Sequence, residues 1–134
     1  MFDSGRRRRQ WGLCLTLALV GCTAHVTSSL KVDGVPFVPT TCRSGQASGF
    51  SGVELVDDRG QRLRLAQALD GTFQGVYFPS GNPIGENLGA CGTLNVQQGF
   101  GVVNGVRNLD GGATLACSTE RHKVTGSANF KNCH

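Results

Sequence analysis

Hydrophobic and polar positions alternate along much of the chain, which is the pattern of half-buried β-strands. The alternation is clearest over residues 61–66, where Leu63 and Leu65 point to one side and two arginines point to the other. Residues 50–56 show a similar pattern, and the polar stretch 57–60 between the two segments has the composition of a tight turn. The two segments therefore predict a β-hairpin.

Further strands are expected wherever apolar positions recur between glycine- or proline-containing turns. These segments are residues 30–38, 72–78, 92–97, 100–109, 113–118 and 123–131. Residues 100–109 fit either one strand or a tight hairpin, because Asn104-Gly105 is a strong two-residue turn signal. Loops are expected over 42–48 and, at greater length, over 79–90.

Roughly seven to nine short strands, with turns every 8–12 residues and no convincing helix, are typical of an all-β domain. We expect a single antiparallel β-sandwich or small barrel. The length of 134 residues allows one domain of this kind.

The amino-terminal segment has a different composition. Four arginines, Arg6 to Arg9, precede an apolar run from Trp11 to Gly21. That run is too short for a membrane span, which needs about 20 residues. A basic segment, a short apolar segment and a small residue predict a secretory signal peptide over residues 1–21.

The four residues Leu19-Val20-Gly21-Cys22 resemble the lipobox of bacterial lipoproteins. The resemblance implies transfer of diacylglyceryl to the Cys22 thiol and cleavage between Gly21 and Cys22. The chain would then divide into a signal peptide over 1–21, a lipidated tether over 22–29 and a β domain over 30–134.

The same resemblance implies a place in the bacterial cell envelope. The residue after Cys22 is Thr23, and the absence of aspartate there is typical of outer-membrane lipoproteins in diderm bacteria. The Arg8-Arg9 pair fits a twin-arginine signal only in part, so the general secretory and twin-arginine routes both remain open. Beyond Cys22, the chain resembles only small, uncharacterised envelope lipoproteins.

Six cysteines become four once the signal peptide is removed and Cys22 is acylated. Their spacings of 49, 26 and 16 contain no close pair of the kind found in zinc sites. An even number in an exported domain predicts two disulfides, with three pairings open. The four cysteines are Cys42, Cys91, Cys117 and Cys133.

The formal charge of +4 is concentrated in the expected signal peptide. Residues 22–134 contain nine basic and eight acidic side chains, which leaves a net charge of +1. Such a small charge gives no support for a nucleic-acid partner. The expected partners are the membrane, through lipidated Cys22, and an unknown envelope protein or glycan.

No residue pattern names a catalytic or metal site. The three histidines, His25, His122 and His134, share no strand or helix register, so neither a metal ion nor a cofactor is predicted. Asp57-Asp58 followed by Arg59 fits a polar turn better than a calcium loop, which needs more oxygen ligands.

The sequence thus favours a non-enzymatic, lipid-anchored envelope protein with a binding or structural role, acting through loops such as 79–90. One alternative is a small-ligand or metal-handling periplasmic module. A hydrolase is a third possibility, and it requires a cleft that joins His122 to a serine or an aspartate.

Overall fold

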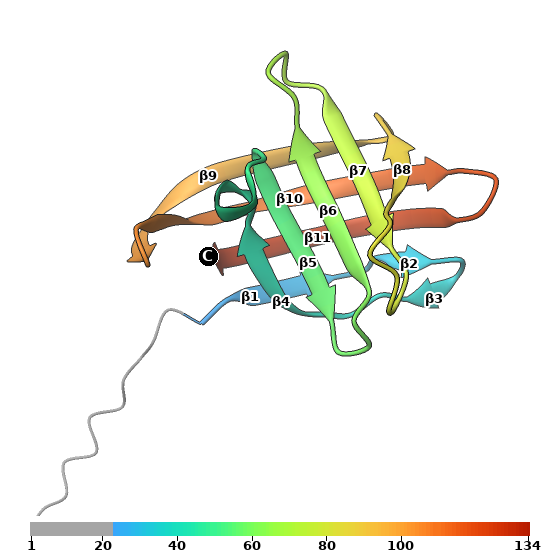
Figure 1. The fold of residues 1–134 in the computed structure, drawn as a ribbon, viewed down its shortest axis with the longest axis horizontal. Coiled ribbons are helices and arrows are strands. Elements are labelled where there is room, and N and C mark those ends of the chain that lie inside the picture. Colours follow the sequence, from blue (N-terminus) through green and yellow to red (C-terminus); the bar gives the residue numbers. More distant parts are fainter. Residues whose placement is uncertain (1–22) are drawn as a thin grey trace, which may run out of the picture.

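Two antiparallel sheets pack face to face in the computed structural model, which describes residues 23–134 (Figure 1). The expected all-β fold is confirmed, and because both sheets are open the fold is a β-sandwich. The expected signal peptide and Cys22 lie outside the described residues. Within residues 23–134, no helix is long and apolar enough to cross a membrane.

The first sheet is built around the last three strands of the chain and has the order β3-β2-β11-β10-β9, with β1 also pairing with β11. Its strands are β1 (His25–Ser28), β2 (Lys31–Val32), β3 (Val35–Pro36), β9 (Gly92–Val103), β10 (Val106–Ser118) and β11 (Lys123–Cys133).

The second sheet is a meander with the order β4-β5-β6-β7-β8, and its strands cross those of the first sheet steeply in Figure 1. Its strands are β4 (Pro39–Ser44), β5 (Gly52–Asp57), β6 (Arg62–Gln67), β7 (Phe73–Phe78) and β8 (Glu86–Gly89). A short 3-10 helix, η1 (Gly45–Ser48), joins β4 to β5.

The core lies between the sheets. Leu63 and Leu65 are fully buried on the inner face of β6, as their alternation with arginines predicts. They belong to one apolar cluster with Leu115 of β10 and Phe130 of β11. Burial of these side chains supplies the main driving force that holds the two sheets together.

The four cysteines form two disulfides, as predicted, and the structure selects one of the three pairings. Cys42 of β4 is bonded to Cys133 at the end of β11. Cys91, between β8 and β9, is bonded to Cys117 of β10. Each bond therefore fixes one edge of the second sheet against the first sheet.

The tether expected over 22–29 is shorter than predicted. Residues His25–Ser28 form β1, with His25 opposite Lys131 and Ser28 opposite Ala128. The segment has no apolar alternation strong enough to mark a strand, because the side with His25 and Thr27 is exposed and the other side is only half-buried, with Val26 as its one apolar residue.

Strand β8 lies within the loop predicted over 79–90, and the second half of β4 overlaps the loop predicted over 42–48. The inward positions of β4 are held by Pro39, Cys42 and Ser44, which give no hydrophobic signal. In β8 only Leu88 is buried. The ambiguity over 100–109 is also resolved, because Asn104 and Gly105 both have positive φ and form the two-residue turn of the β9–β10 hairpin.

The two disulfides should differ in their contribution to stability, because they close loops of different length. The Cys42–Cys133 bond spans 91 residues and the Cys91–Cys117 bond spans 26. Chain entropy predicts a loss of about 4–5 kcal/mol when both members of the first pair are changed to alanine, and about 3–4 kcal/mol for the second pair. Urea unfolding of the two double variants checks this order, and a larger loss for the second pair would contradict it.

Candidate functional site

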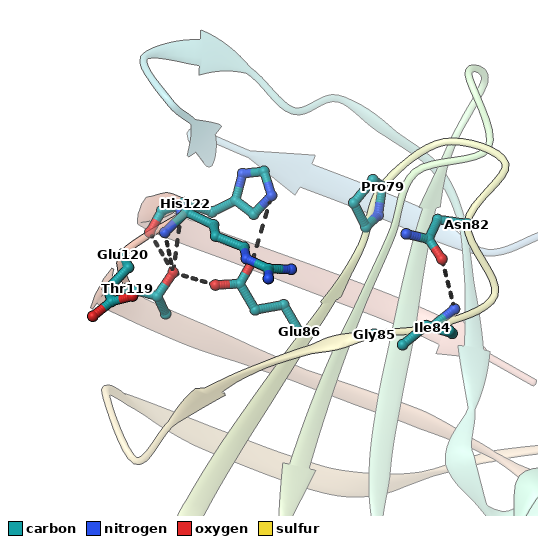
Figure 2. Close-up of a pocket in the computed structure, with 9 residues that line it drawn as sticks. Pro79, Asn82, Ile84, Gly85, Glu86, Thr119, Glu120 and His122 are labelled. Carbon is teal, nitrogen blue, oxygen red and sulfur yellow. Dashed lines mark hydrogen bonds and ion pairs between the residues drawn. The ribbon is translucent and has the colours of Figure 1, made fainter.

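A cleft of about 530 Å³ lies between the loop that joins β7 to β8 and the turn that joins β10 to β11 (Figure 2). The loop belongs to the long 79–90 segment that the sequence identifies as a candidate binding region. The cleft is lined by Pro79, Asn82, Ile84, Gly85, Glu86, Thr119, Glu120, Arg121 and His122.

The loop side of the cleft is held by local hydrogen bonds and by one close approach. The Asn82 side-chain oxygen accepts the Ile84 N–H at 2.9 Å, and the Asn82 N–H donates to the Pro79 carbonyl at 3.1 Å. A Cβ atom on Gly85 would lie 2.4 Å from a methyl carbon of Val76, so only glycine lets the loop pack this closely on β7. The Ile84 side chain is left exposed at the cleft.

The turn side of the cleft is organised by Thr119. Its hydroxyl oxygen accepts the backbone N–H groups of Arg121 at 3.2 Å and His122 at 3.0 Å. The same hydroxyl donates to Oε1 of Glu86, which comes from β8 in the other sheet. Thr119 therefore caps the turn and joins it to the second sheet.

His122 lies between two carboxylates. Its Nδ1 is 2.8 Å from Oδ2 of Asp33, and its Nε2 is 3.4 Å from Oε2 of Glu86. Asp33 sits in the β2–β3 turn, so the three side chains come from three separate segments that are distant in sequence. We call Asp33, Glu86, Thr119 and His122 the His122 clasp. Figure 2 shows the Thr119, Glu86 and His122 part of it.

Two neighbouring groups have shifted pKa values. Two hydrogen bonds lower the pKa of Asp33 below its usual value of 3.8. The larger effect comes from His122 and the smaller from the Lys123 backbone N–H. The pKa of Tyr77 is raised above 10.0. Burial is the largest cause, and the negative charges of Asp33, Asp57 and Glu86 add to it. The Tyr77 ring meets the His122 ring edge-on, with centroids 4.9 Å apart. Tyr77 therefore stays neutral and forms an aromatic wall behind the clasp.

The clasp does not have the geometry of a nucleophilic site. The structure does join His122 to an aspartate, which is one part of what a hydrolase would need. The other ring nitrogen faces Glu86, however, and the Thr119 hydroxyl is engaged with Glu86 and the turn backbone. A His-activated nucleophile would need a hydroxyl or thiol within hydrogen-bond distance of that nitrogen.

The clasp also does not converge on a point where a metal ion could bind. The two carboxylates approach opposite nitrogens of one ring, so their oxygens do not face a common centre. Among residues 23–134, no group of three His, Cys, Asp or Glu side chains is placed to hold a metal ion. His25 begins β1, and His134 follows the end of β11.

Asp57 and the two arginines of β6 also have structural partners. Asp57 accepts the backbone N–H groups of Arg59 at 3.0 Å and Gln61 at 2.8 Å, so it stabilises its own turn. Arg62 and Arg64 both pair with Glu54, at 3.3 and 3.4 Å, on the outer face of the second sheet. Two arginines share one glutamate, so this cluster keeps a net positive charge of one.

Sequence reasoning did not identify Asp33 and Glu86 as partners of His122. Locally, the sequence shows only the turn-forming pair Asp33-Gly34 and a polar stretch over 119–122, and neither feature indicates that the two segments touch. Searches of protein-family models, curated proteins and solved structures found no match to this chain.

The Asp33–His122 contact predicts a specific effect on acid stability. Because the folded-state pKa of Asp33 is lowered, its carboxylate stabilises the fold above about pH 4, and this contribution is lost as the pH falls through the folded-state pKa. We expect Asp33→Asn to reduce stability at neutral pH and to flatten the loss of stability below about pH 4. Urea unfolding over a series of acidic pH values measures both effects.

A matched variant tests the cause of that effect. In a His122→Gln background, Asp33→Asn should change the acid dependence less, because the largest cause of the pKa shift has already been removed. If Asp33→Asn left the acid dependence unaltered in the otherwise unchanged chain, the assigned role of this contact would be wrong.

Proposed function

We propose that this protein is a lipid-anchored, non-enzymatic protein of the bacterial cell envelope that binds an envelope protein or glycan through the cleft beside the His122 clasp. The anchor is the diacylglyceryl group on Cys22, which the lipobox-like sequence predicts. Two acyl chains meet the requirement for stable membrane attachment, which one chain does not. The two disulfides support an exported location, because such bonds persist in oxidising compartments.

One observation supports binding rather than catalysis. The clasp side chains in the cleft are already bonded to one another: Glu86 uses one carboxylate oxygen for Thr119 and the other for His122. Groups held in this way form a preorganised wall and are not poised to exchange protons with a substrate. The open sides of the cleft carry Ile84, Glu120 and Arg121, which offer apolar and charged contacts to a partner.

The anchor predicts the outcome of a single substitution. Cys22→Ala removes the thiol that would be acylated. Mature protein should therefore leave the membrane fraction, and any protein that is not cleaved should accumulate as the precursor. Cys14→Ala, which changes a cysteine inside the expected signal peptide, serves as the control and should leave the protein membrane-bound. Fractionation of the native host with immunodetection gives the result. Full retention of mature Cys22→Ala protein in the membrane would contradict the anchor.

The cleft predicts where a partner makes contact. A photo-crosslinking amino acid at Ile84 should give a discrete adduct in the native envelope, because this exposed side chain lines the cleft. The same group at Leu69 is the control, since Leu69 is equally large and fully exposed in the β6–β7 turn. Adducts at neither position, or equal adducts at both, would argue against a binding role for the cleft.

A further inference from the structure

The β9–β10 hairpin extends beyond the strands beside it. The pairing of β10 with β11 begins at Leu109, opposite Cys133, whereas β10 starts at Val106 and its hairpin with β9 turns at Asn104-Gly105. Residues on the tip side of Leu109 are therefore paired only within the hairpin. Figure 1 shows this projecting end on the same side of the molecule as the carboxyl terminus.

The projecting end exposes apolar side chains. Phe100 is fully exposed and Val102 is 57% exposed, although both lie in a β-strand. Val102 pairs with Arg107, so these two side chains share one face of the hairpin. Strand β9 lies at the edge of its sheet and contains neither a charged residue nor proline, which are the usual means of protecting an edge strand.

The described chain begins beside this hairpin. The Asn132 side-chain N–H donates to the Thr23 carbonyl at 3.4 Å, and the Asn132 backbone N–H donates to Asp110 at 2.8 Å. Residue 23 is therefore near Asp110, six residues from the hairpin turn at Asn104. At about 3.3 Å per strand residue, the tip extends about 20 Å from that point. Since Cys22 directly precedes Thr23, an acyl anchor there would place the membrane surface within reach of the tip.

We propose that the tip of the β9–β10 hairpin docks on the lipid bilayer, with Phe100 and Val102 in the headgroup boundary and Arg107 near lipid phosphates. This inference rests on the proposed anchor at Cys22, which sets the distance between the domain and the membrane. The anchor makes the contact intramolecular, so even a small apolar tip is held at high effective concentration at the surface. Exposed Lys131 lines the same surface pocket as Asp110, so these two charges offset each other and Arg107 supplies the positive charge nearest the tip.

The occupant favoured by these observations is lipid rather than a second copy of the chain. Edge-to-edge pairing of two copies would use the backbone of β9 and would not explain why its most exposed apolar residues, Phe100 and Val102, gather at the end nearest the anchor. Membrane docking uses those side chains directly. Membrane docking would also fix the orientation of the domain. The hairpin lies at the start of β10 and the His122 clasp at the turn after its end, so the clasp would lie at the far end of that strand from the hairpin.

Fluorescence quenching by brominated lipid tests the proposal. The full chain is produced in its native host with Trp11→Phe, so that an introduced tryptophan is the only one. Phe100→Trp is the reporter, and Leu69→Trp, at another fully exposed apolar position, is the matched control. Each purified protein is reconstituted into vesicles of phosphatidylcholine with a minority of phosphatidylglycerol, either unlabelled or brominated on the acyl chains. Flotation of the vesicles reports the anchor separately.

We expect both variants to float with the vesicles and the Phe100→Trp indole to be quenched several-fold more strongly than the Leu69→Trp indole. Flotation with no quenching at position 100, or with equal quenching at both positions, would overturn hairpin docking and leave the anchor intact. Flotation with an unquenched Phe100→Trp indole and a dimeric mass in detergent would overturn it in favour of pairing between copies. Failure to float would refute the anchor, and membrane docking of the hairpin would fail with it.

Discussion

Two disulfides hold the edge strands of the second sheet against the first sheet, and the rest of the fold depends on that constraint. Cys42 fixes β4 to the end of β11, and Cys91 fixes the end of β8 to β10. A domain of about 110 residues buries only about two-thirds of its unfolded surface, so covalent links between sheets make a large contribution to its stability. Burial of Leu63, Leu65 and their neighbours then fills the space that the links define.

The same constraint determines the candidate binding cleft. Cys117 lies two residues before Thr119, and Cys91 lies shortly after the strand that carries Glu86. The disulfide therefore holds the β10–β11 turn close to β8, and Thr119 and His122 reach Glu86 across that junction. At the other end of the sandwich, the bond between Cys42 and Cys133 lies near the point where the described chain begins. A cleft at one end and a membrane contact at the other would suit a protein that holds a partner away from the bilayer.

The sequence predicted those parts of the fold whose side chains alternate between water and the core. The leucines of segment 61–66 show this. At Asn104-Gly105 the sequence left one strand and a hairpin both open, and the structure has the hairpin. Sequence reasoning failed for β4, because cysteine and serine fill the inward positions there, and for β1, which was predicted as tether. The disulfide pairing and the contact of His122 with Asp33 depend on how distant segments meet. Local patterns of polarity contain no information on such contacts.

We propose that an acylated Cys22 anchors a domain fixed by two disulfides, and intact mass spectrometry of the protein extracted from its native membrane measures both features at once. We expect a chain that begins at Cys22, carries the mass of a diacylglyceryl group, and has no free thiol at Cys42, Cys91, Cys117 or Cys133. A chain that begins at Met1, with an unmodified Cys22 and free thiols at those four positions, would contradict it.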